Sequence, residues 1–294
     1  MTGDNAVVIG ASGLVGRALM RKLNSEQIPA LGTYRTKPES QAVPLDITDP
    51  LGVREFLVRI RPSIIFMTAA LTHVDYCEDH PDEAIQINVE GPRSIATAAG
   101  RLGARLVFYS TEYVFDGSAG PHSEEAQPSP LNVYGRTKLE AERVIATILP
   151  DCLILRTAVV YGWEPDSKNF AIQVYERARA GERMTIPFDQ ISNPTLAKYL
   201  AEVSVKLVQQ GVSGVVNVVG KDWLPRSEFA LALVKLFGGN PDLVIPVSTA
   251  SLNQQASRPL RGGLRTEKLR ELMGSEAMSL ADALEKLKCQ IPIS

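Results

Sequence analysis

Tyr134 and Lys138 lie four residues apart in the stretch NVYGRTK, at the start of an expected helix. This spacing places both side chains on one face of the helix. A phenol has an ordinary pKa of about 10 and is a poor proton donor at neutral pH. A nearby ammonium group stabilises the phenolate and lowers that pKa. The pair is therefore a candidate for acid–base chemistry, although the same spacing is common on plain surface helices.

A second group of reactive side chains ends the apolar run RLVFYS, in the stretch FYSTEYVFDG at residues 108–117. Thr111, Glu112 and Tyr113 follow where a buried strand should reach the surface. Ligands bind at the carboxyl ends of parallel strands, so this position favours an active-site edge. We expect the Thr111 hydroxyl to hydrogen-bond a substrate carbonyl beside the Tyr134 hydroxyl.

A glycine-rich turn precedes both groups in the sequence VVIGASGLVGRAL. Gly10 permits the sharp turn after a strand, Gly13 lets the backbone approach a pyrophosphate, and Gly16 allows close packing of helix on strand. Free N–H groups at the start of the following helix then face the anion. Glycines also occur in ordinary turns, but the strand before and the helix after predict a dinucleotide site.

The second expected strand ends LGTYRTK and lacks the acid that would bind the ribose hydroxyl of NAD. Arg35 and Lys37 stand there instead and suit a 2′-phosphate, unless they are simply solvated loop cations. We therefore expect NADP(H), with NAD(H) still possible. Asp46 follows the third strand and either meets the adenine edge or serves the turn.

The order of elements predicts an α/β fold built on a doubly wound Rossmann-type parallel sheet. Strands alternate with helices, and most strands are continuous apolar runs, typical of a sheet covered on both faces. One long helix is expected over Pro81–Leu102. Residues 1–162 form the expected NADP-binding domain with the Thr, Tyr and Lys, and 163–294 a smaller C-terminal α/β substrate lobe. Segments of the lobe can interleave with the first domain.

Composition narrows the class of protein. The chain has 294 residues and a formal net charge of −2, which gives no basic footprint for nucleic acid. No apolar run approaches the roughly 18 residues that span a bilayer, and the N-terminal sequence lacks the basic region of a signal peptide. Three scattered cysteines fit a reducing compartment. We expect a cytoplasmic protein that binds neither nucleic acid nor membrane, with a homodimer possible.

The stretch THVDYCEDH, residues 72–80, contains metal-ligand types. It follows a strand and leads into Pro81 and a helix, so solvated loop and helix-start roles are the preferred interpretation. We expect no metal site.

Together these motifs resemble the extended short-chain dehydrogenase/reductase superfamily. The segments YSTEYVFDG, NVYGRTKLEAE, LRTAVVYG, FDQISNPT and SRPLRGGL, with NF at 169–170, are similar to the dTDP-4-dehydrorhamnose reductase family, also called the sugar nucleotide-binding family. The resemblance runs from about residue 5 to 288. It implies an NADPH-dependent reductase of a nucleotide-linked 4-keto-6-deoxy sugar.

The resemblance also implies a role for each matched position. Tyr134 protonates the ketone oxygen as hydride arrives from the nicotinamide, Lys138 lowers the Tyr134 pKa and holds the nicotinamide ribose, and Thr111 polarises the carbonyl. The cofactor residues are Gly10, Ser12, Gly13, Leu14 and Val15 at the pyrophosphate, Asp46 and Ile47 at adenine, Ala69 and Ala70 at the cofactor ribose, and Tyr134 and Lys138, in addition to Arg35 at the expected 2′-phosphate. The substrate residues are Thr111, Glu112, Tyr113, Asn169, Gln190 and Arg258.

Glu112 needs a separate interpretation. Related sugar-nucleotide dehydratases carry two successive acids after the Thr, but here Tyr113 takes the second position. Elimination needs one group to protonate the leaving hydroxyl and another to remove a proton. We therefore expect Glu112 to position neighbouring groups or to fix a loop.

Two departures from the family keep other functions open. Leu14-Val15 replaces a usual Gln in the glycine turn, and Ala158-Val159 replaces a usual Ser-Trp that resembles a wall of the sugar pocket, with Trp163 a few residues later. A non-sugar ketone is one alternative. A second is a non-catalytic NADP-binding subunit like the regulatory β subunit of methionine adenosyltransferase. A third is an epimerase or an oxidising dehydrogenase of the same superfamily. An epimerase would retain NAD tightly, which Arg35 and Lys37 argue against.

Overall fold

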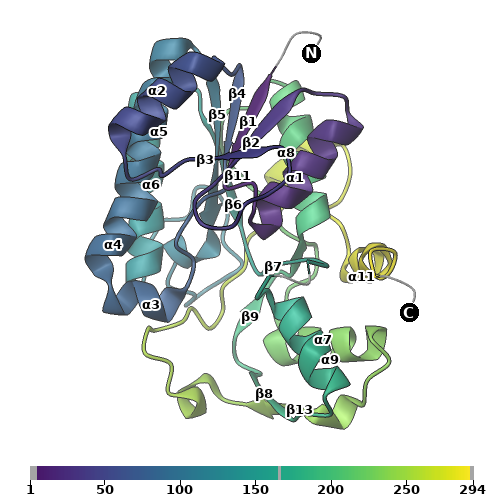
Figure 1. Ribbon diagram of the computed structural model, residues 1–294. Coiled ribbons are helices and arrows are strands. Elements are labelled where there is room, and N and C mark those ends of the chain that lie inside the picture. The colour runs from purple at the N-terminus through teal and green to yellow at the C-terminus, as the bar shows by residue number, and fades with distance from the viewer. Residues whose placement is uncertain (1–4, 165–166, 292–294) are drawn as a thin grey trace.

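The computed structural model describes residues 5–164 and 167–291. Its centre is a seven-stranded sheet in the order β11-β6-β5-β4-β1-β2-β3, with every neighbouring pair parallel. Helices cover both faces of this sheet, and a smaller lobe lies below it in Figure 1. The strands are β1 (Ala6–Ile9), β2 (Ala30–Tyr34), β3 (Ala42–Pro44), β4 (Ile64–Met67), β5 (Arg105–Thr111), β6 (Leu153–Thr157) and β11 (Gly214–Asn217).

The central strands are apolar on both sides because both faces of the sheet are covered. Every residue of β1, β4 and β6 is buried. Alternate residues contribute to two different cores: Val8 and Phe66 belong to one, Val7 and Ile65 to the other. The continuous apolar runs in the sequence thus correspond to a sheet buried between two helical layers.

Each face of the sheet is covered by a different set of helices. One consists of α2 (Pro50–Ile60), α5 (Gly91–Leu102) and α6 (Val133–Ile148), on the left in Figure 1. The other consists of α1 (Leu14–Ser25) and α8 (Ala197–Gln209), which pack against each other. Helix starts follow local chemistry: Asp49 caps α2 by accepting a hydrogen bond from the Leu51 amide, with Pro50 in the first turn.

The smaller lobe has its own core, formed by α7 (Phe170–Arg179), α9 (Arg226–Leu236) and the strand pair β8 (Met184–Pro187) and β13 (Val244–Val247). Its other short strands are β7 (Val160–Tyr161), β9 (Ile191–Ser192), β10 (Thr195–Leu196) and β12 (Leu224–Pro225). The chain beyond residue 162 does not stay in this lobe, because α8 and β11 return to the large sheet.

The predicted long helix over Pro81–Leu102 is divided. It consists of α4 (Pro81–Ile85), a π-helical turn (Gln86–Glu90) and α5. Pro92 provides a physical reason, since a proline lacks the N–H that continues an α-helical ladder. The remaining helices are α3 (Val74–Asp79), α10 (Glu267–Met273), α11 (Leu280–Lys288) and the 3-10 turns at Glu112–Val114, Pro241–Leu243 and Thr249–Leu252. Within residues 5–164 and 167–291 no helix is long and apolar enough to span a membrane.

Candidate active site

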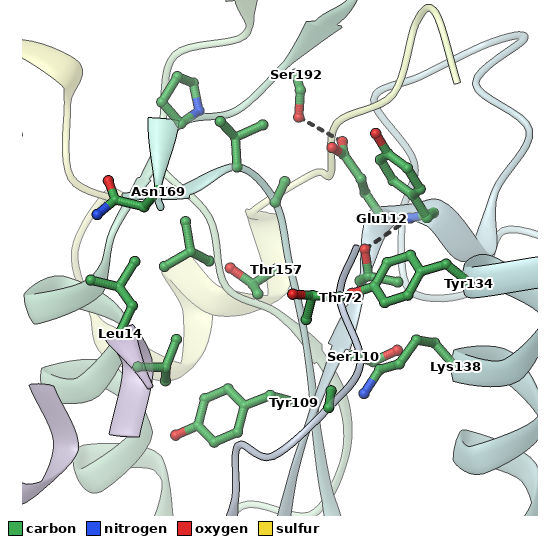
Figure 2. A pocket seen from close by; sticks show the side chains of 18 of the residues that line it. Leu14, Thr72, Tyr109, Ser110, Glu112, Tyr134, Lys138, Thr157, Asn169 and Ser192 are labelled. Atoms are coloured by element: carbon green, nitrogen blue, oxygen red, sulfur yellow. Dashed lines mark hydrogen bonds between the residues drawn. The ribbon is translucent and has the colours of Figure 1, made fainter. Parts of the chain in front are cut away.

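A cavity of about 560 Å³ lies between the carboxyl ends of the central strands and the smaller lobe. It extends from the glycine turn to β9 and the start of α9, and Figure 2 shows its wall from close by. Of the residues expected at the site, those that line the cavity are Gly13, Leu14, Val15, Ala70, Thr111, Glu112, Tyr113, Tyr134, Lys138, Asn169 and Gln190. Gly10, Ser12, Arg35, Asp46, Ile47, Ala69 and Arg258 do not line it.

The glycine turn has the close contacts that its sequence predicts. Gly10 has a φ of +90°, and a Cβ there would lie 2.7 Å from the amide nitrogen of Ala69. A Cβ on Gly16 would lie 2.2 Å from the Gly10 carbonyl oxygen. Gly13 faces the cavity and leaves room for a ligand, since the nearest atom to its Cβ position is 3.4 Å away. These residues fit a pyrophosphate cradle.

Two buried hydroxyls give an independent indication of a polar ligand. Ser110 Oγ and Thr157 Oγ1 have no hydrogen-bond partner within the part of the chain that the structure describes, and both residues line the cavity. Buried polar groups without partners are rare in proteins. A dinucleotide would bring hydroxyl and amide groups to this wall.

The expected adenosine end lies at the open edge of the sheet. Arg35 Nε lies 3.9 Å from Asp46 Oδ2, and both side chains are half-exposed. Asp46 Oδ1 accepts hydrogen bonds from the amide and the hydroxyl of Thr48, and these lower the pKa of the Asp46 carboxyl. Ile47 is buried against the position of Gly91, so its side chain faces the protein interior.

Tyr134 and Lys138 enter the cavity from α6, on the same side of the view in Figure 2. The rings of Tyr134 and Tyr113 meet edge-on, with centroids 5.8 Å apart. Lys138 Nζ lies 3.9 Å from the centroid of the Phe108 ring. The helix thus presents the phenol and the amine to the cavity one turn apart.

The pKa of Tyr134 differs from the sequence-based expectation, in which the Lys138 ammonium lowers it. Burial raises the pKa of Tyr134, and a hydrogen bond with Thr111 lowers it only in part. Burial also lowers the pKa of Lys138 to about 7, against the opposing effect of Glu142. Desolvation is therefore the largest cause of the pKa shift of each group.

Two contacts fix the start of α6. The buried Asn132 side chain accepts a hydrogen bond from the Gly135 amide and donates one to the Ser257 carbonyl, both 2.8 Å long. Gly135 lies so close to the preceding turn that a Cβ would come 2.1 Å from the carbonyl oxygen of Tyr113. Tyr134, between these two anchors, is held against Tyr113.

Asn88 is a supporting residue that sequence reasoning missed. It is buried in the π-helical turn and holds both polar groups of Leu71, with the Leu71 amide 2.8 Å from Asn88 Oδ1. Its amide also donates to Thr137 Oγ1 on α6. The residue thereby joins the loop after β4 to the helix of Tyr134. The available sequence signal was Gly91-Pro92, because a proline interrupts the α-helical hydrogen bonds. The π-helical turns that can form at such an interruption are frequent at functional sites.

Glu112 is buried and faces away from Tyr134, towards Ser192, in Figure 2. The Ser192 hydroxyl donates to Glu112 Oε2 over 2.6 Å, and the Gly263 amide donates to the same oxygen. Burial raises the Glu112 pKa to about 7, while these two bonds and Arg226 lower it. The contacts match a residue that ties the strand end to the smaller lobe.

The expected substrate residues differ in what their side chains do. Asn169 caps α7 by accepting a bond from the Ala171 amide, and Gln190 donates to Gln254 over 3.0 Å. Arg258 forms an ion pair with Asp75 at 2.9 Å, outside the cavity. Arg226, which no sequence pattern singled out, does line the cavity.

The two departures from the family pattern both reach the cavity. Leu14, Val15, Ala158 and Val159 line it. Trp163 does not line it and instead contacts Tyr175 and Phe237 in the smaller lobe, with the Tyr175 ring 4.8 Å away. Trp163 therefore does not rebuild the wall that the missing Trp would form.

The THVDYCEDH stretch makes structural contacts. His73 accepts a hydrogen bond from the Tyr76 amide at the start of α3, Glu78 accepts one from the Val133 amide, and His80 stacks on Tyr76. Cys77 is buried. Within the described residues no group of three or more His, Cys, Asp or Glu side chains could hold a metal ion.

Comparison with known proteins adds the family. Residues 5–290 match the family described as RmlD substrate binding domain, to which this chain belongs. "Probable low-salt glycan biosynthesis reductase Agl14" from Haloferax volcanii is 32% identical over 96% of this chain and 97% of its own length. "Methionine adenosyltransferase 2 subunit beta" from Danio rerio is 30% identical over 91% of this chain and 84% of its own. A dTDP-4-dehydrorhamnose reductase from Bacillus anthracis, solved in complex with NADP, superposes with a TM-score of 0.90 at 29% identity, covering 98% of this chain and 99% of that one.

Proposed function

We propose that this protein is an NADPH-dependent reductase of a nucleotide-linked 4-keto-6-deoxy sugar. One observation carries the proposal: Thr111, Tyr134 and Lys138 line the same cavity as the glycine turn. A dinucleotide on that turn would lie beside an acid–base group. The relatives named as reductases and the NADP in the Bacillus anthracis structure support the same reaction class and cofactor.

The chemistry is the conversion of a ketone to a secondary alcohol. NADPH supplies a hydride for the carbonyl carbon. The Tyr134 phenol donates its proton to the carbonyl oxygen, and the Thr111 hydroxyl hydrogen-bonds to the same oxygen. Lys138, the amine one turn along α6, holds ribose hydroxyls and stabilises the phenolate that remains. Glu112 supports this arrangement by fixing the loop that contains Gly263.

The similarity to the β subunit of methionine adenosyltransferase supports a second candidate, a non-catalytic NADP-binding subunit. That function requires cofactor binding but no substrate turnover. It gives no reason for the Tyr134 phenol and the Thr111 hydroxyl to share a hydrogen bond at the cavity, which is why we prefer the reductase.

Consumption of NADPH with enzymatically prepared dTDP-4-keto-6-deoxyglucose tests the proposal. The assay is run with and without a 3,5-epimerase. Oxidation only with the epimerase indicates a rhamnose-type substrate, and oxidation without it indicates a different deoxysugar. NADPH binding without oxidation in either assay contradicts the proposal and favours the regulatory subunit or another ketone.

A further inference from the structure

Arg226 is the first residue of α9 and lines the part of the cavity next to the smaller lobe. Its amide donates a 2.9 Å hydrogen bond to the Gln190 carbonyl, which fixes the start of the helix. Its guanidinium lies 4.3 Å from the centroid of the Phe170 ring. An arginine stacked on an aromatic face keeps the N–H groups at its edge available for an anion.

Arg226 differs from Arg156 and Arg258, two arginines whose side chains are largely buried, in having no acidic partner within the described residues. Arg156 is paired with Glu142 at 2.7 Å and Arg258 with Asp75 at 2.9 Å. Among the residues that the structure describes, no carboxylate lies within ion-pair distance of Arg226. Burial lowers the Arg226 pKa, against the opposing effects of Tyr113 and Glu112. A desolvated charge without a partner is costly, so a ligand that supplies the counter-charge is favoured.

The surrounding wall also favours an anion. Lys168 lines the cavity as a second, exposed cation. Glu112 is the acidic side chain nearest to this charge in the lining, but its carboxylate already accepts bonds from Ser192 and Gly263. The positive charge of Arg226 interacts electrostatically with Glu112 and Tyr113. The Tyr113 ring in turn contacts the ring of Tyr134. An anion at Arg226 would therefore lie close to the reacting groups.

We propose that Arg226 binds the diphosphate of the substrate, in place of Arg258, the arginine that the sequence analysis placed among the substrate residues. The inference rests on the proposed function, because it takes the substrate to be nucleotide-linked. A guanidinium can form two parallel charge-assisted hydrogen bonds to phosphate oxygens. Arg258 is engaged by Asp75 and by the Ala256 carbonyl, and it lies outside the cavity lining.

The test measures binding of thymidine diphosphate, uridine diphosphate and thymidine to the NADP-loaded protein. We compare the wild type with Arg226→Gln, Arg226→Lys and Arg258→Gln. Arg261→Gln is the matched control, because Arg261 also lies over an aromatic ring, that of Trp223, but is exposed and does not line the cavity. NADP binding to each variant reports whether the fold is kept.

Arg226→Gln should weaken nucleoside diphosphate binding by about 10- to 100-fold, the range of a charge-assisted hydrogen bond. Thymidine binding should stay unchanged, Arg226→Lys should be intermediate, and Arg261→Gln should match the wild type. Equal losses for thymidine and its diphosphate, unchanged diphosphate binding, or a selective loss in Arg258→Gln instead would each overturn the assignment.

The same experiment separates this inference from the proposed function. A wild type that binds NADP but neither diphosphate rejects the nucleotide-linked substrate, and the inference with it. A wild type that reduces a sugar nucleotide, together with an Arg226→Gln variant of unchanged KM, rejects only the role of Arg226.

Discussion

The Ser192 hydroxyl donates a 2.6 Å hydrogen bond to the Glu112 carboxylate and thereby joins the smaller lobe to the end of the central strand β5. The Gly263 amide donates to the same carboxylate oxygen, so one acid holds β9 and the 257–264 loop together. Gly262 is part of this contact, because a Cβ there would lie 2.7 Å from Glu112 Oε2. We therefore propose that Glu112 maintains the architecture of the cavity and takes no part in proton transfer.

The first prediction is that Glu112→Gln retains turnover within about tenfold of the wild type. Glutamine keeps an oxygen that can accept from Ser192 and Gly263, whereas a lost acid–base group would cost roughly 10²- to 10⁴-fold. Steady-state kinetics with the sugar nucleotide provides the measurement. A near-total loss of kcat in a folded variant would show that Glu112 takes part in the chemistry.

The same variant should change how stability depends on pH. Burial raises the Glu112 pKa from an ordinary 4.5 to about 7, so between these values the folded protein holds a proton that the unfolded chain has released. The contribution of Glu112 to the free energy of unfolding therefore falls as pH rises through this window. The Tm of Glu112→Gln relative to the wild type should increase between pH 5 and pH 8. A constant difference across that range would contradict the raised pKa.

The third prediction concerns the proton donor. Tyr134→Phe removes the hydroxyl but keeps the ring that packs edge-on against Tyr113. NADPH binding should be unchanged, and kcat should fall by at least about 100-fold, as expected for loss of a general acid. Titration of NADPH fluorescence and single-turnover rates provide the two readouts. An active Tyr134→Phe variant would refute the catalytic assignment.

A fourth prediction follows from the close contact between Gly135 and the Tyr113 carbonyl. In Gly135→Ala the added methyl group would meet the Tyr113 carbonyl at 2.1 Å, so α6 must move. We expect a loss of about 1–3 kcal/mol in the free energy of unfolding, typical of overpacking, with reduced kcat. Gly100→Ala is the control, because that helical glycine is exposed and its nearest neighbour is the flexible Leu149 side chain at 3.3 Å. The free energy of unfolding of both variants is measured with denaturant. Equal values for the two variants would contradict the close contact at Gly135.

The parts of the molecule that could be predicted are those whose signal is local. The apolar runs, the glycine turn and the Tyr134–Lys138 spacing each need only a short window of sequence, and the parallel sheet follows from their order. The family to which the chain belongs was indicated by the same short motifs.

The parts that could not be predicted depend on contacts between distant segments. Arg258 and Arg226 are both arginines in the expected lobe, and nothing local shows that Asp75, 183 residues from Arg258, engages one of them. The desolvation that lowers the Lys138 pKa depends likewise on the whole fold. Asn88 gains its role only through Leu71 and the helix of Thr137.

The last prediction concerns the choice between NADPH and NADH. The half-exposed Arg35 guanidinium contacts Asp46 only at 3.9 Å, so it remains free to face a 2′-phosphate at the edge of the sheet. Arg35→Gln should raise the KM for NADPH by about tenfold or more, the cost of a charge-assisted hydrogen bond to phosphate. The KM for NADH should change little, because NADH lacks that phosphate and serves as the internal control. Equal effects on both cofactors would mean that Arg35 supports the β2–β3 loop instead of reading the phosphate.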